Sequence, residues 1–215
     1  MEQALGADVV LDLRCDGEVE MHLYTHPAAW ERLAPLAALT ACQAVLLAEV
    51  SGGNPIDEAL SGPWTALAVR FPDHPVPMAC ASTTVELRSR SDVCRDLGGR
   101  DAQAIVDYLI HLGMLDGQPD QPTAACLPTP LSRSEALEAP SAGLLSHVVP
   151  LGATVAVGDV VAEITDLESG DVSLIRATTA GVLYARSDTR IAEVGKRIGK
   201  IAGDRPFRDG PLLSP

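Results

Sequence analysis

Hydrophobic residues in the first half of the chain alternate between strand-like and helix-like patterns. Continuous apolar runs predict buried strands, and apolar positions that recur every three or four residues predict helices. Strands are predicted at Val9–Leu13, which we expect to be buried on both faces, and at Val19–Tyr24, Ala44–Val50 and Thr83–Leu87. Helices are predicted at Ala28–Leu39, kinked by Pro35, at Ile56–Phe71, and at Asp101–Leu112, which Gly113 ends. This alternation implies an α/β fold with a mixed, mostly parallel sheet and flanking helices.

The second half has a different pattern. Residues 114–134 are rich in proline and glycine, which predicts a linker between domains 1–113 and 135–215. From residue 135 onward, short apolar runs are separated by Gly-Asp or Ser-Gly turns, as in a small all-β barrel or sandwich. Two similar segments, beginning at Gly152 and Arg190, resemble the barrel-sandwich fold of biotinyl and lipoyl carrier domains. The matching hairpin tip, near Glu168–Asp171, has no lysine, so we expect no swinging-arm role.

Composition narrows the possible partners and location. The formal net charge of −13 argues against binding to nucleic acid or to an anionic membrane. No apolar stretch reaches the roughly 20 residues of a membrane span, and the N-terminus lacks the pattern of a signal peptide. The cysteines are dispersed without CxxC spacing, which indicates reduced thiols in a cytoplasmic protein: Cys15, Cys42, Cys80, Cys94 and Cys126.

Two predicted strands carry carboxylates near their ends. The first reads Val10-Leu-Asp-Leu-Arg14 and the second Thr83-Thr-Val-Glu86-Leu. A partly desolvated Glu86 could have a raised pKa and take part in proton transfer. The alternatives are ordinary ion pairs on one strand face, between Glu86 and Arg88 and between Asp12 and Arg14.

The order and spacing of these motifs, with the valine- and glycine-rich β domain after a linker, resemble the succinylglutamate desuccinylase/aspartoacylase family. These relatives of the zinc carboxypeptidases hydrolyse the amide of N-acyl amino acids. The resemblance covers nearly the whole chain and implies that Glu86 occupies the general-base position. It places Asp12 beside the metal and Arg14 where the family has a histidine ligand in an Asp-Leu-His strand.

The chain departs from this family at the metal. A guanidinium group has no lone pair with which to ligate zinc, and no His-x-x-Glu pair occurs in the sequence. We therefore expect an N-terminally truncated family member, with no zinc bound by this chain alone and no hydrolysis by it alone. The alternative is a non-catalytic paralogue that acts as a binding or accessory subunit. A truncated sheet predicts a homo-oligomer or a partner chain that covers it.

Other polar groups offer weaker candidates. His22 and His26 lie in an extended segment, where about 13 Å would separate them, too far to share a metal. Of the remaining histidines, His74 is predicted in a surface loop and His111 on the face of a helix. The position of His147, at the start of the β domain, gives no indication of a role. A loop at Ser51–Asn54 follows a buried strand and reads as a plain turn or a ligand loop. Further candidates are Arg88–Asp92, either a substrate contact or a turn with Ser91 as helix cap, and Tyr184 with Arg186, which could reach the site.

Overall fold

The first half folds around a five-stranded sheet. The computed structural model describes residue 4 and residues 6–120 and 127–207. The sheet has the order β1-β5-β3-β4-β6, and its neighbours are parallel except β3 and β5. Its strands are β1 (Val9–Asp16), β3 (His22–Thr25), β4 (Ala44–Leu47), β5 (Ala81–Ser89) and β6 (Pro128–Pro130). The prediction of a mixed, mostly parallel sheet is confirmed.

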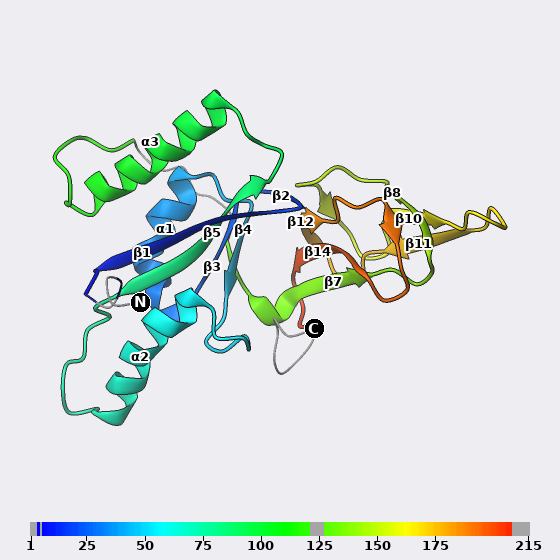
Figure 1. Ribbon diagram of the computed structural model, residues 1–215. Helices are drawn as coiled ribbons and strands as arrows, with labels where there is room; N and C mark the ends of the chain where they lie inside the picture. Colours follow the sequence, from blue (N-terminus) through cyan, green and yellow to red (C-terminus); the bar gives the residue numbers. More distant parts are fainter. Residues whose placement is uncertain (1–3, 5, 121–126, 208–215) are drawn as a thin grey trace.

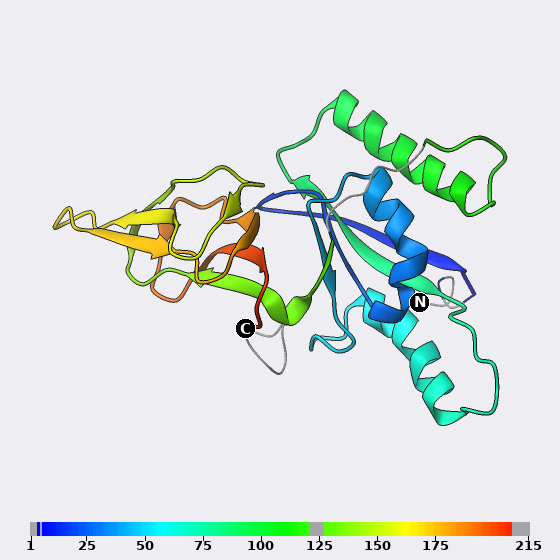
Figure 2. The same ribbon diagram turned by 180° about the vertical axis from the view of Figure 1, so that it is seen from behind.

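Helices cover both faces of this sheet (Figure 1, Figure 2). The helices are α1 (Trp30–Leu39), which follows the short 3-10 turn η1 (Pro27–Ala29), α2 (Ile56–Arg70) and α3 (Arg95–His111). Leu33 of α1 and Tyr108 of α3 share one core cluster with Val85 of β5. The other face of β5 packs against α2, where Ser61 Oγ lies 2.8 Å from Ser82 Oγ. Because successive strand residues point to opposite faces, the α2 face also carries the even-numbered residues of β5.

Several predicted elements need correction. The strand at Val9–Leu13 is not buried on both faces, because β1 lies at the edge of the sheet and Leu13 is 48% exposed. The predicted strand Val19–Tyr24 is divided into β2 (Glu18–Val19) and β3, which belong to different sheets. The last helix begins at Arg95, six residues before the predicted start, and Gly113 follows its end with a φ of +71°.

The second half is all-β and consists of two sheets. One has the order β11-β10-β8-β13, and the other has β2-β12-β14-β7, with β9 also paired to β12. The strands are β7 (Ser134–Glu138), β8 (Gly143–His147), β9 (Thr154–Val155), β10 (Val160–Thr165), β11 (Val172–Arg176), β12 (Gly181–Arg186), β13 (Ile191–Ala192) and β14 (Arg197–Gly203). A core cluster that includes Leu145, Ile164 and Ile201 unites the two sheets. The finer expectation of a barrel-sandwich domain stays a prediction, as do the domain boundaries.

The two halves exchange strands. β2, from the start of the chain, pairs with β12 of the second half, and β6, from the predicted linker, pairs with β4 of the first sheet. A shared apolar cluster lies where they meet and contains Leu46, Leu131 and Tyr184. This exchange brings β14 close to the ends of β1 and β5 (Figure 1). Across the described ranges, the helices are all too short or too polar to cross a membrane.

Candidate functional site

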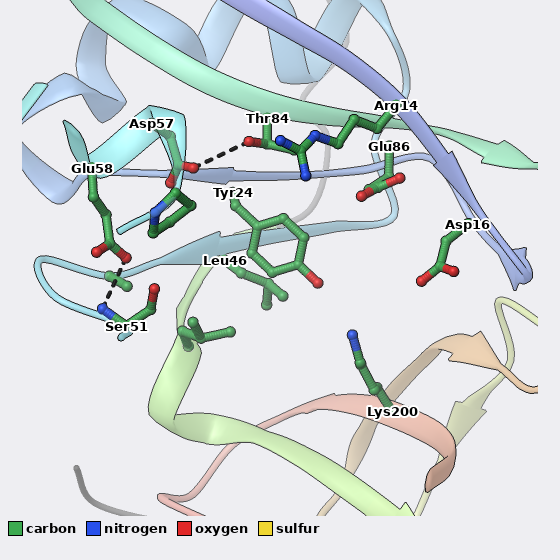
Figure 3. A pocket seen from close by; sticks show the side chains of 13 residues that line it. Arg14, Asp16, Tyr24, Leu46, Ser51, Asp57, Glu58, Thr84, Glu86 and Lys200 are labelled. Atoms are coloured by element: carbon green, nitrogen blue, oxygen red, sulfur yellow. Dashed lines mark hydrogen bonds between the residues drawn. The ribbon is translucent and has the colours of Figure 1, made fainter. Parts of the chain in front are cut away.

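A pocket of about 190 Å³ opens on the α2 face of the first sheet, where the two halves meet (Figure 3). Its lining comes from β1, β3, β4, β5, the segment between β4 and α2, the first turn of α2, and two residues of the second half. The lining residues are Arg14, Asp16, Tyr24, Leu46, Ala48, Ser51, Pro55, Asp57, Glu58, Thr84, Glu86, Leu131 and Lys200.

Strand register explains why these side chains gather. On β5, Glu86 lies opposite Arg14 of β1 and opposite His22 of β3, and Thr84 lies opposite Tyr24. Directly paired residues of neighbouring strands project from the same face. The two motifs singled out in the sequence, around Arg14 and Glu86, are therefore brought together by adjacent parallel strands.

Glu86 projects into the pocket with an unsatisfied carboxylate. Within the described part of the chain, its buried Oε2 atom has no hydrogen-bond partner. Burial and the neighbouring Asp16 carboxylate raise its pKa, while Arg14 and Lys200 oppose that rise. The alternative prediction of an ion pair between Glu86 and Arg88 is wrong, because Arg88 binds Asp101 of α3 at 2.5 Å. The general-base role of Glu86 stays a prediction.

Arg14 forms the ion pair expected with Asp12, and its Nε donates to Asp12 Oδ2 at 2.7 Å. Its guanidinium group lies over Thr84 on the pocket face of the sheet (Figure 3). From there its charge partly offsets the raised pKa of Glu86 and of Asp57. Arg14 thus supplies positive charge to a pocket that is rich in carboxylates.

Asp57 and Glu58 form a second acidic pair that the sequence reading missed. Both lie in the first turn of α2 and are buried, with exposed fractions of 3% and 8%. Asp57 accepts a hydrogen bond from Thr84 Oγ1 at 3.1 Å, and burial raises the pKa of Asp57 to about 6. Glu58 accepts the backbone N–H of Ser51 at 2.9 Å. The only sequence signal is ordinary, since acidic residues are common in a first helical turn.

Lys200 is a second missed residue, and it comes from β14 in the other half of the chain. Its ammonium group points toward Asp16 and Glu86 (Figure 3). Burial lowers the pKa of Lys200, with Arg197 acting in the same direction and the two carboxylates acting against it. Its position depends on the packing of two distant segments, which local sequence patterns do not reveal.

The histidines do not supply metal ligands to this pocket. His22 is buried, its Nδ1 donates to the Glu20 carbonyl at 2.7 Å, and burial lowers its pKa to about 4. His26 caps η1 through its Nδ1, which accepts the N–H of Ala28. His74 and His111 are exposed, and His147 binds the Ser187 carbonyl.

The other candidates are distributed as follows. Ser51 is buried and lines the pocket, whereas Ser91 does not cap α3, whose N-cap residue is Cys94. Tyr184 is fully buried and does not line the pocket, and its ring is 4.9 Å from that of His22. Arg186 binds Glu18 at 2.5 Å. Cys126 lies outside the described residues.

The pocket does not fit a zinc ion. Over residues 6–120 and 127–207, no group of three or more His, Cys, Asp and Glu side chains is arranged to hold a metal. The potential ligands in the lining are carboxylates, without the imidazole that zinc sites of hydrolases use. A fixed guanidinium cation shares the space and repels a second cation.

Comparison with known proteins gives matches among solved structures. No protein-family model and no curated protein sequence matches this chain. A protein of Shewanella amazonensis assigned to the succinylglutamate desuccinylase/aspartoacylase family matches with a TM-score of 0.80 and 25% identity, over 91% of this chain and 54% of its own. A second such protein, from Shewanella frigidimarina, gives 0.79 and 21%, over 95% and 56%.

A third match is the ectoine utilization protein EutE (DoeB) of Ruegeria pomeroyi, with a TM-score of 0.68 and 19% identity, over 92% of this chain and 61% of that one. The described chain thus shares a fold with these proteins over nearly all of its own length. It spans between 54% and 61% of the length of the three.

Proposed function

We propose that the chain is a member of the succinylglutamate desuccinylase/aspartoacylase family, to which similar solved structures are assigned, and that its pocket binds a small N-acyl amino acid without hydrolysing it unaided. The family resemblance supplies the substrate class. The chemistry of the lining supplies the rest, because the pocket combines hydrogen-bonding carboxylates with two cations, Arg14 and Lys200.

The observation that carries this proposal is the unpartnered Oε2 of Glu86 beside Arg14. A buried carboxylate oxygen without a donor is costly, and a ligand amide N–H would satisfy it. Arg14 and Lys200 offer donors to a ligand carboxylate. An N-acyl amino acid carries both groups, the amide N–H and the carboxylate.

The lack of hydrolysis follows from the donor set. Members of the family use zinc to activate water, and Arg14 stands at the position of a histidine ligand without being able to ligate. Glu86 keeps the general-base position, so a metal site supplied by another segment or polypeptide would complete the hydrolytic machinery. We expect no turnover from the chain by itself.

Calorimetric titration tests this function with N-succinyl-L-glutamate and N-acetyl-L-aspartate as probes. We expect wild type to bind at least one probe, and Arg14→Gln to bind it about tenfold more weakly, because a charged hydrogen bond is lost. Arg70→Gln, at the exposed end of α2, removes the same charge away from the pocket and should bind like wild type. Equal binding by Arg14→Gln, or probe hydrolysis by the chain with added zinc, would contradict the proposal.

A second candidate function is that of an accessory subunit that docks through β1. This strand lies at the sheet edge, and its last four residues, 13–16, are exposed. An edge strand presents free backbone donors and acceptors to another strand. The occupant would be a second copy or a chain that carries the metal ligands.

Light scattering after size exclusion tests the docking. We expect a mass above that of the monomer, which Leu13→Lys lowers by placing a charge on the edge. Val69→Lys changes a more exposed apolar residue, on α2, and should leave the mass unchanged. A monodisperse wild-type monomer that binds no hydrophobic dye would rule this candidate out.

A further inference from the structure

A second pocket, of about 240 Å³, adjoins the first on the side of β12 and β14. The two pockets share Asp16 and Lys200. The charged residues that line the second pocket are Arg90, Arg186, Arg197, Lys200, Asp16 and Asp188. Cations therefore outnumber carboxylates in this lining, although the chain as a whole carries a net charge of −13.

Two of these cations are already neutralised. Arg90, in the turn after β5, binds Asp188 at 2.5 Å, which joins the two halves at the rim of the pocket. Arg186 binds Glu18 at 2.5 Å, and Glu18 also accepts Arg190. The carboxylates of Asp188 and Glu18 are thus committed to arginines other than Arg197.

Arg197 and Lys200 remain available. Neither makes an ion pair or hydrogen bond with any residue that the structure describes. The carboxylate of Asp16 faces Lys200 from the first-pocket side and accepts the N–H of Gly17 through Oδ1. Glu86 also faces Lys200, but from the first pocket. Among the residues that line the second pocket, two cations without an ion pair therefore meet one carboxylate, Asp16, which leaves an excess of positive charge and of N–H donors there.

We propose that the second pocket is an anion subsite, in which Arg197 and Lys200 bind a carboxylate or phosphate group. A guanidinium fork and an ammonium group are the side chains that proteins use to bind oxyanions. The Arg90–Asp188 pair fixes the rim, so Asp188 does not compete for Arg197. Lys200 lines both pockets, so the subsite rests in part on the proposed function, whereas Arg197 lines the second pocket and not the first and makes the test separate.

The test is a calorimetric titration at low ionic strength with inorganic phosphate and with succinate as separate probes. Arg197 lines the second pocket alone, so Arg197→Gln is the main variant. Its side chain is exposed and makes no hydrogen bond to a described residue, so the fold should survive the change. Arg176→Gln, on β11, removes the same charge at a distance. Glu86→Gln changes the lining of the first pocket and removes a carboxylate that faces Lys200, so it should not weaken anion binding in the second pocket.

We expect millimolar or tighter binding of at least one probe to wild type and to Arg176→Gln, binding at least as tight to Glu86→Gln, and a loss of about tenfold in Arg197→Gln. Binding of phosphate alone assigns a phosphate group, and binding of succinate alone assigns a carboxylate. No binding of either probe to wild type, or equal binding by Arg197→Gln, overturns the subsite. Neither outcome alters the Arg14 test of the first pocket.

Discussion

Arg14 holds a positive charge among carboxylates that would otherwise repel one another. It binds Asp12 directly and acts electrostatically on Glu86 and Asp57, whose pKa values are raised despite its presence. A metal ion would supply such a charge together with open coordination positions. Arg14 supplies the charge alone, without positions at which a water molecule could be coordinated.

Stability should depend on pH through Asp57. Its pKa is raised from 3.8 to about 6, so the folded state favours the protonated form. Stability from this group is present at low pH and is lost as pH rises from about 4 through 6, and the difference amounts to roughly 3 kcal/mol at most.

Asp57→Asn should therefore increase the free energy of unfolding by about 1–3 kcal/mol at pH 8 and change it little at pH 4. Urea titrations at both pH values measure the difference. Asp73→Asn, in an exposed loop, serves as the control. An equal gain at pH 4 and pH 8 would show that ionisation of Asp57 is not the cause.

Restoring one ligand should not restore a metal site. We expect Arg14→His to bind less than about a tenth of an equivalent of zinc, because stable sites need three or four protein ligands. Elemental analysis after dialysis measures the zinc content, with wild type as the reference. Stoichiometric zinc in this single variant would mean that carboxylates of the pocket complete the coordination.

At the residue scale, sequence reasoning succeeds where spacing along one strand decides contacts. Asp12 and Arg14 are two residues apart and pair as expected, because period-2 alternation puts them on one face. Glu86 and Arg88 have the same spacing and do not pair, since the chain bends at Arg88, where φ is +80°. Asp57 and Lys200 reach the pocket through tertiary packing, which no local pattern encodes.

At the scale of elements, two glycines of the α3 region have different roles, one within the helix and one just after its end. Gly113 follows the helix with a φ of +71°, and its N–H donates to the Ile110 carbonyl. Gly98 lies within the helix, where no other atoms crowd its position. The same substitution should therefore have opposite effects at the two sites.

Gly113→Ala should destabilise the fold by about 1 kcal/mol, because a Cβ disfavours the left-handed conformation. Gly98→Ala should stabilise it by about 0.5–1 kcal/mol, since alanine has the higher helix propensity. Urea denaturation of both variants measures the changes. Effects of the same sign would contradict the assigned end of α3.

Helix and strand identity was largely predictable in the first half, while sheet position was not. Ile56–Phe71 was predicted within one residue of α2, because Pro55 and the apolar spacing mark its start and course. The prediction that β1 is buried on both faces is wrong, because an apolar run does not reveal whether a strand lies at the centre or at the edge of a sheet. The sequence does not indicate the early start of α3, because residues 95–100 contain two glycines and a single large apolar residue, Leu97.

At the scale of the whole molecule, Glu18 ties the first half to the second through Arg186 and Arg190. Burial raises the pKa of Glu18, but hydrogen bonds from Arg190 and Arg186 outweigh it and hold that pKa below its usual value. The resulting stability is present above the unfolded pKa and is lost as pH falls through the lowered one.

Glu18→Gln should cost about 1 kcal/mol at pH 7 and less at high salt, because the pairs are partly exposed to solvent. Thermal unfolding at low and high salt measures the cost, and Glu168→Gln at the exposed tip between β10 and β11 is the control. An unchanged melting temperature at low salt would show that Glu18 does not join the halves energetically.

The exchange of β2 and β6 has a consequence for cutting the polypeptide. A protease that cleaves among residues 114–120 severs the backbone without separating the products, since each piece lends a strand to the other's sheet. Neither piece produced separately would have all its ladder partners, and each would tend to aggregate. Co-expressed from two open reading frames, the pieces should reassemble, which makes this region a natural place to build a split protein.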